Sequence, residues 1–152
     1  MGEKGKKLVY IGSDHAGFKQ KAELKSYIES LGYFVTDIGC FNEESCDYPD
    51  IAREVSEKVT ENAGAFGVLI CGTGEGMAMT ANKFKNIRAA LATNEELAEM
   101  SRKHNDANVL TMGARITDLE TMKKITAKFL STPFESSEER HIRRVNKIGQ
   151  ES

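Results

Sequence analysis

The sequence lacks any apolar run of about 18 residues, so nothing in it predicts a transmembrane helix. Its amino-terminal stretch contains GEKGKK and no long apolar segment, and we expect no secretory signal. A myristoylation motif starting at Gly2 needs serine or threonine at position 6, where Lys6 stands. Strong charge of one sign is also missing, since 21 basic and 23 acidic residues give a net charge of −2. We therefore expect no nucleic-acid and no membrane partner.

Cysteines are few, and their arrangement disfavours the usual cysteine-based sites. The three of them, Cys40, Cys46 and Cys71, are an odd number and form no Cys-x-x-Cys motif. This pattern suits a protein of the reducing cytoplasm better than a disulfide scaffold or a zinc site. We expect Cys40 and Cys46 to be incidental, and we expect neither a metal site nor a cofactor.

The 152 residues suit one domain over residues 1–152, with a flexible tail over residues 1–7. Short apolar segments typical of strands alternate with segments of helical periodicity. The expected strands are Leu8–Gly12, Tyr33–Gly39, Phe66–Cys71, Ile87–Ala92 and Asn108–Met112. The expected helices are Phe18–Leu31, one through Ile51, Val55 and Val59, one ending near Phe84, Asn94–Lys103, and two that start at capping boxes at Thr117 and Ser136.

This alternation predicts an α/β fold. Strands that are apolar throughout are buried on both faces, as in a parallel sheet covered by helices. We predict a single-domain, doubly wound, Rossmann-like α/β/α sandwich with a five-stranded parallel sheet and an additional carboxyl-terminal helix. Ligands of such folds bind beyond the carboxyl ends of the strands, at a switch point in the strand order. The loops to inspect follow Gly12, Gly39, Cys71, Ala92 and Met112.

The loop after the third expected strand carries the strongest functional signal. Cys71 leads directly into Gly72-Thr73-Gly74-Glu75-Gly76, with glycine at every second position. Such a loop lets backbone N–H groups converge on an anion at the start of a helix. A helix amino terminus also favours the thiolate form of cysteine, so the segment can supply a base or nucleophile together with an oxyanion hole. The alternative is a buried strand cysteine followed by a tight turn.

Motifs for nucleotides are missing. The loop after Cys71 lacks the Gly-Lys-Ser/Thr ending of a P-loop, and its glycines do not follow the GxGxxG spacing. The first loop, Gly12–Gly17, matches neither motif. A dinucleotide site is therefore not expected.

Three histidines and several basic residues fall near the expected loops. His15 follows Asp14 just after the first strand. His104 and Asn105 precede the fifth strand, so they reach a site at the carboxyl ends only if their loop folds over or serves a neighbouring subunit. His141 lies in the last expected helix. Taken singly, each histidine is typical of a solvated surface.

The last expected helix also carries Arg140 and Arg144 one helical turn apart. Two arginines at this spacing can grip a phosphate, although an isolated helix with them more often presents a solvated charged face. Arg115 follows the fifth strand, and Tyr48 offers a hydroxyl and a flat ring in the second loop.

A thiolate, a loop of backbone amides, histidines, a carboxylate and arginines indicate chemistry on a small phosphorylated molecule. Proton abstraction next to a carbonyl needs a base, donors for the enediolate oxygen and an anchor for a remote phosphate. No metal-ligand spacing is visible, so hydrogen bonds would stabilise the carbanion. Cysteine protease or acyl-transfer chemistry uses a similar set, and the residues alone leave both readings open.

Several segments together form a highly specific pattern: Ser13–Phe18, Asp47–Asp50, Cys71–Met77, Ala81–Lys83, Ile87–Ala90, His104–Val109 and Arg140–Arg144. On this pattern, the chain from about Leu8 to Ile148 resembles the type B ribose-5-phosphate isomerases, in a family that includes galactose-6-phosphate isomerase subunits. The resemblance implies a cytoplasmic enzyme of the pentose phosphate pathway that interconverts D-ribose 5-phosphate and D-ribulose 5-phosphate without a metal. It also implies a homodimer or homotetramer with active sites at the subunit interface.

The resemblance further implies roles for individual residues. Cys71 would be the base that moves a proton between C1 and C2, and His104 would help to open the furanose ring. The loop from Gly72 to Gly76 would hold the enediolate oxygen, and the Thr73 hydroxyl would help to move protons between oxygens. Asp14 would bind sugar hydroxyls. Asn105 would hydrogen-bond the substrate and Tyr48 would border the sugar. The substrate phosphate would be lined by His15, Arg115, Arg140, His141 and Arg144.

Some members of that family carry glycine where Cys71 stands and glutamate where Met77 stands, so this chain looks like the cysteine type. Glu75 departs from many members, which have an apolar or amide residue there; unless it points to solvent, its charge disfavours a second anion. Galactose 6-phosphate is the close alternative substrate, disfavoured by the His-Asn-Asp and Arg-His-x-x-Arg patterns, and allose 6-phosphate stays open as a second substrate. A non-catalytic sugar-phosphate-binding module would need neither Cys71 nor His104.

Overall fold

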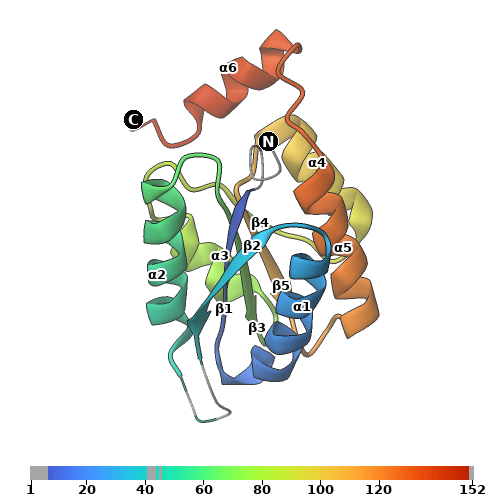
Figure 1. Cartoon of the computed structure of the whole chain (residues 1–152). Coiled ribbons are helices and arrows are strands. Elements are labelled where there is room, and N and C mark those ends of the chain that lie inside the picture. The colour runs from blue at the N-terminus through green and yellow to red at the C-terminus, as the bar shows by residue number, and fades with distance from the viewer. Residues whose placement is uncertain (1–6, 41–43, 45, 151–152) are drawn as a thin grey trace.

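The computed structural model describes residues 7–40, 44 and 46–150, so residues 1–6 of the expected tail lie outside the described part. One parallel sheet forms in the order β2-β1-β3-β5-β4, as Figure 1 shows. Its strands are β1 (Leu8–Ser13), β2 (Phe34–Gly39), β3 (Phe66–Cys71), β4 (Ala89–Leu91) and β5 (Val109–Gly113). The helices are α1 (Phe18–Ser30), α2 (Tyr48–Glu61), α3 (Glu75–Ala81), α4 (Glu95–Asn105), α5 (Leu119–Ser131) and α6 (Glu139–Lys147), with a 3-10 turn η1 (His15–Gly17). The predicted fold class is confirmed.

Apolar side chains fill the space on both faces of the sheet. One cluster joins the sheet to α1, α4 and α5 and includes Leu24 and Phe129. The other joins the opposite face to α2 and α3 and includes Val55 and Met77. All six residues of β3 are buried, as expected for an apolar strand covered on both faces. The edge strand β2 is only partly covered, and its Phe34 is exposed.

The strand order reverses between β1 and β3. β1 is followed by β2 on one side, whereas β3 is followed by β4 and β5 on the other. The carboxyl ends of β1 and β3 lie side by side, since Ser13 pairs with Ile70 and the Asp14 amide donates to the Ile70 carbonyl at 3.2 Å. The connections leave these two ends in opposite directions, which creates a crevice for a ligand.

Several element boundaries differ from the sequence expectation by one or more residues, and at β4 and α5 a side chain takes the place of a regular backbone partner. β4 is shorter than Ile87–Ala92, since the Arg88 amide donates to the Asn108 side chain at 2.8 Å. The cap of α5 is Asp118 and not Thr117; the Asp118 carboxylate accepts from the Thr121 amide at 2.9 Å.

The last helix begins later than its expected capping box at Ser136. α6 starts at Glu139, because the Glu138 amide donates to the Glu135 carbonyl at 3.1 Å and closes a turn first. No helix in the described part of the chain is long and apolar enough to cross a lipid bilayer.

The expectation that Cys40 and Cys46 are incidental is wrong in this structure, where a disulfide joins them with their Cα atoms 6.5 Å apart. The spacing of the cysteines does not account for this pairing, whereas their backbone contacts do. The Cys40 amide donates to the Ser13 carbonyl at 2.8 Å, and the Cys46 amide donates to His15 Nδ1 at 3.2 Å. Both cysteines are therefore anchored beside the end of β1.

Candidate active site

Cys71 is the last residue of β3, at the reversal of the strand order. Its side chain is buried, with 5% of the residue exposed. The following loop folds back over it, and the Gly74 amide donates to the Cys71 Sγ at 3.1 Å. On the other side, the Ala114 amide donates to the Cys71 carbonyl at 2.8 Å. Backbone groups of two loops thus fix the thiol in place.

Two glycines of this loop are required by its geometry. Gly74 has φ +86°, and a Cβ there would lie 2.9 Å from the Met112 carbonyl carbon. A Cβ on Gly76 would collide with the Tyr48 ring as that ring is placed here. The backbone of the loop therefore approaches both β5 and the tyrosine more closely than a residue with a side chain allows.

Thr73 and Glu75 alternate with the glycines, and both are exposed. The Glu75 amide donates to Thr73 Oγ1 at 3.3 Å, which orients the hydroxyl at the mouth of the loop. Glu75 lies in the first turn of α3 on the solvent side, so it is not packed against the buried thiol.

Asp14 and His15 approach the same crevice from the end of β1. Asp14 is buried, and its Oδ1 accepts from the Ala16 amide at 2.9 Å, while its own amide bonds to β3. His15 Nδ1 accepts from the Cys46 amide, so in the neutral ring Nε2 carries the proton. The Cys46 amide therefore orients the His15 ring.

Arg115 completes this part of the site from the end of β5. Its amide donates to the Gly72 carbonyl at 3.0 Å. Its Nη1 lies 3.4 Å from the position that a Cβ on Gly72 would occupy, so the guanidinium lies over the loop. The structure thus gathers a carboxyl-edge group, which we define as Asp14, His15, Tyr48, Cys71 to Gly76, and Arg115.

The remaining candidate residues form a second set, the amino-edge group of His104, Asn105, Arg140, His141 and Arg144. They lie at the end of α4 and in α6, beyond the opposite edge of the sheet (Figure 1). In the parallel β3–β5 pair, Gly67 faces Val109 at one end and Cys71 faces Gly113 at the other. The two ends are about 13 Å apart along the strand. Within this chain the structure does not bring the two groups together.

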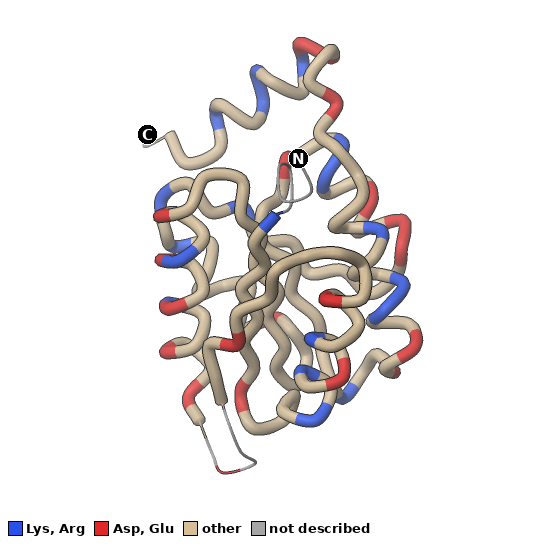
Figure 2. The backbone as a smooth tube through the Cα atoms, in the orientation of Figure 1, with Lys and Arg blue, Asp and Glu red and all other residues tan. Residues whose placement is uncertain are grey.

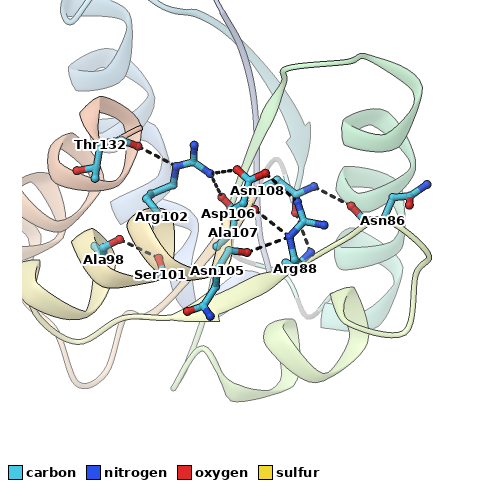
Figure 3. A network of polar contacts seen from close by, with 10 residues as sticks. All are labelled: Asn86, Arg88, Ala98, Ser101, Arg102, Asn105, Asp106, Ala107, Asn108 and Thr132. Carbon is cyan, nitrogen blue, oxygen red and sulfur yellow. Dashed lines mark hydrogen bonds and ion pairs between the residues drawn. The ribbon is translucent and has the colours of Figure 1, made fainter. Parts of the chain in front are cut away.

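A polar clamp holds the end of α4 (Figure 3). Asp106 has φ +46° and caps the helix, and its carboxylate lies 2.8 Å from Arg102 Nη1 and 3.4 Å from Arg88 Nη2. Arg88 Nε also donates to the Asn105 and Asp106 carbonyls at 3.0 and 2.9 Å. The clamp fixes the backbone next to His104. Sequence reasoning did not single out these arginines, because Arg88 is 18 residues from Asp106, and Arg102 also donates to the distant Thr132 carbonyl.

The two histidines of the amino-edge group lie against each other. The rings of His104 and His141 stack with centroids 4.5 Å apart. Glu135 Oε1 lies 3.6 Å from His104 Nε2 and 3.4 Å from His141 Nε2. Sequence reasoning missed Glu135, since no spacing motif links it to either histidine.

α6 presents an exposed basic surface. Arg140, Arg143, Arg144 and Lys147 lie along it, and Figure 2 shows these charges on a helix that projects from the body of the molecule. Of these four basic residues, only Arg140 forms an ion pair within the described part of the chain, with Glu138 at 3.6 Å. Such a surface can hold a dianionic group.

Comparisons with known proteins cover nearly the whole chain. The model of the ribose/galactose isomerase family matches residues 9–148. Ribose-5-phosphate isomerase B from Escherichia coli (strain K12) is 39% identical over 142 residues, or 93% of this chain and 94% of the relative. The structure of ribose 5-phosphate isomerase B from Anaplasma phagocytophilum is 46% identical, with a TM-score of 0.88 and coverage of 95% and 97%. The corresponding structure from Clostridium thermocellum is 43% identical, with a TM-score of 0.87 and coverage of 93% and 95%.

The family match and the structural match support the same assignment of this chain. The position of Cys71 at the reversal of the strand order is consistent with that assignment. Gly74 and Gly76, which make close contacts with the β5 backbone and the Tyr48 ring, stand where the sequence pattern placed its strongest signal. The chain is an isomerase and belongs to the ribose/galactose isomerase family.

Proposed function

We propose that this enzyme interconverts D-ribose 5-phosphate and D-ribulose 5-phosphate without a metal, as a cytoplasmic step of the pentose phosphate pathway. The observation that carries the proposal is the buried Cys71 thiol, which the glycine-rich loop holds beside Asp14 at the carboxyl edge. Relatives of similar length are named for this substrate. Because Cys71 stands where some family members have glycine, we assign the role of the base to its thiolate.

The proposed reaction moves one proton between carbons and one between oxygens. The Cys71 thiolate takes the proton from C2 of the open-chain aldose, and the C–H electron pair becomes the C1–C2 double bond. The C1 carbonyl electrons move to O1, where backbone amides of the loop stabilise the enediolate charge. The Thr73 hydroxyl passes the O2 proton to O1, and Cys71 returns its proton to C1 as the C2 carbonyl forms. Atoms and charge balance over the cycle.

The substrate needs further contacts that the carboxyl-edge group does not supply. Asp14 would bind sugar hydroxyls and Tyr48 would border the sugar. His104 would help to open the furanose ring, in which the O1 hydroxyl loses a proton and the ring oxygen gains one as its bond to C1 breaks. Asn105 would be hydrogen-bonded to the sugar. The phosphate would lie among His15, Arg115, Arg140, His141 and Arg144.

We propose that the enzyme is at least a homodimer, because the two groups of residues lie at opposite edges of one subunit. A second copy related by a two-fold axis can place its amino-edge group over the first copy's carboxyl-edge group. The projecting α6 supports this arrangement, since its Ile142 and Ile148 are exposed in the single chain. Each active site would then contain residues of both subunits.

The test is conversion of ribose 5-phosphate to ribulose 5-phosphate by purified protein in the presence of EDTA. We expect turnover in the wild type and loss of most of it in Cys71→Ala. The matched control is Ser56→Ala, another small buried substitution, which lies in α2 away from the loop and leaves turnover unchanged. Binding of the sugar phosphate by Cys71→Ala separates loss of the base from loss of the site.

Three results would contradict parts of the proposal. Near-normal kcat in Cys71→Ala would refute the base assignment. Activity that EDTA abolishes and added metal restores would refute metal independence. Turnover of galactose 6-phosphate or allose 6-phosphate in place of ribose 5-phosphate would move the substrate to a six-carbon sugar phosphate while retaining the isomerase chemistry.

A further inference from the structure

Three side chains with metal-binding atoms converge where α4, α6 and the loop before α6 meet. His104, Glu135 and His141 each offer one ligand atom, and these atoms all lie within 4.8 Å of one another. Two imidazole nitrogens and one carboxylate oxygen are a common ligand set for zinc, with a fourth position left for water. No ion pair with lysine or arginine occupies Glu135 among the described residues; its carboxylate faces the two histidines.

The two distances from Glu135 are close to those between ligands of a tetrahedral site. Zinc binds histidine nitrogen and carboxylate oxygen at about 2.0–2.1 Å, so two such ligands at the tetrahedral angle lie about 3.4 Å apart. Glu135 Oε1 is 3.4 Å from His141 Nε2 and 3.6 Å from His104 Nε2. The most distant pair of ligand atoms would have to approach by no more than about 1.4 Å.

A chain of backbone hydrogen bonds holds the three residues in register. The Glu135 amide donates to the Lys103 carbonyl at 3.1 Å, which fixes Glu135 beside His104. The Glu138 amide donates to the Glu135 carbonyl at 3.1 Å, and the His141 amide donates to the Glu138 carbonyl at 3.0 Å. Because the backbone positions exist before any ion binds, little ordering is needed on binding.

The side chains differ in their freedom to adjust. His141 is buried, with 7% of its side chain exposed, whereas His104 and Glu135 are 44% and 41% exposed. The stacked rings must tilt before their in-plane lone pairs can point to one ion, and the exposed His104 has the room to turn. His141 would be the fixed ligand and the other two the adjustable ones.

We propose that His104, Glu135 and His141 bind a divalent transition metal ion, with zinc as the best match, and that this ion inhibits the enzyme. The inhibition rests on the proposed function, in which His104 opens the sugar ring and His141 lies at the phosphate. An imidazole nitrogen bound to zinc can neither exchange a proton nor donate a hydrogen bond to the substrate. Zinc and sugar phosphate therefore compete for the same two histidines.

Zinc binding is measured by calorimetry in a Cys71→Ala background, which removes the one thiol outside the disulfide. Reductant and chelator are omitted. We expect one zinc ion per subunit. Glu135→Gln keeps the shape of the side chain but removes its charge, and we expect it to bind zinc at least about tenfold more weakly. The matched control is Glu138→Gln, three residues away, whose carboxylate faces Arg140. It should bind zinc like the background protein.

A second variant and a second probe guard against misfolding. His104→Asn changes an exposed ligand and should weaken zinc binding similarly, and the visible spectrum of bound cobalt(II) should change in both ligand variants but not in Glu138→Gln. Equal zinc affinity in the background, Glu135→Gln and His104→Asn proteins would overturn the site. Far-ultraviolet circular dichroism checks that each variant is folded.

Activity is a separate readout, taken with Cys71 intact. We expect zinc to inhibit turnover, and Glu135→Gln to need at least about tenfold more zinc for the same inhibition. Zinc that binds at the three residues but leaves turnover unchanged would overturn the inhibition. A protein without isomerase activity would overturn the proposed function, whereas calorimetry would still decide the metal site.

Discussion

The separation of the two residue groups predicts that two inactive variants restore activity when mixed. Cys71→Ala damages the carboxyl-edge group and His104→Ala damages the amino-edge group. In a two-fold dimer each site takes one group from each subunit. A mixed dimer of the two variants therefore has one site with both lesions and one site with neither.

The size of the effect follows from counting. Random association of equal amounts gives about half mixed dimers, and half of their sites are intact, so about a quarter of all sites recover. We expect about a quarter of the wild-type specific activity after the variants are unfolded together and refolded, or co-expressed. Each variant alone, taken through the same procedure, should stay nearly inactive.

The matched control mixes Cys71→Ala with Asp14→Asn. Both lesions lie in the carboxyl-edge group, which each site takes from one subunit only. Every site of a mixed dimer then carries one lesion, and we expect no recovery. Mass spectrometry of the intact complexes shows that mixed dimers have formed. If they have formed and the first mixture stays inactive, sites shared between subunits are refuted.

Three further predictions concern the phosphate end and the helix caps. Arg144→Ala should raise KM for ribose 5-phosphate about tenfold or more, since a charged hydrogen-bond donor to phosphate is lost; an unchanged KM would place the anchor elsewhere. Asn94→Ala removes the cap of α4, whose side chain accepts from the Leu97 amide at 2.8 Å, and should lower the free energy of unfolding by about 1 kcal/mol, read as a melting shift of roughly 2–4 °C. Hydrogen bonds from Thr121 hold the pKa of Asp118 below its ordinary value, so its contribution to stability is present at neutral pH and is lost as the pH falls through the folded-state pKa. Between neutral and acid pH, the melting temperature of Asp118→Asn should therefore fall less than that of the wild type.

The sheet could be predicted from the sequence because its signal is local. Continuous apolar segments such as Phe66–Cys71 mark the buried strands, and polar segments separate them. The order of β5 and β4 could not be predicted in this way, since nothing in the alternation of elements tells which strand lies next to β3. Boundaries shifted where a side chain took a backbone partner, as Asn108 did at the start of β4.

The carboxyl-edge group was also predictable, because the carboxyl ends of parallel strands meet at one edge. Cys71 ends β3 and Asp14 follows the adjacent β1, so both lie where that rule places them. The pairing of Cys40 with Cys46 and the approach of Glu135 to two histidines were not predictable. Both depend on loops folding back on distant backbone, and no spacing in the sequence records such contacts.

The fixed geometry within each chain would let the proposed site, divided between two chains, still be accurate. Asp106 and its two arginines hold the end of α4, and two loops hold Cys71, so neither group depends on the other for its shape. Association then needs only to bring two preformed surfaces together, which costs less ordering than folding a site on binding. The proposed zinc ligands all lie in one chain, so metal binding would need no partner chain. An ion held there would meet the substrate only in the assembled site, where both compete for His104 and His141.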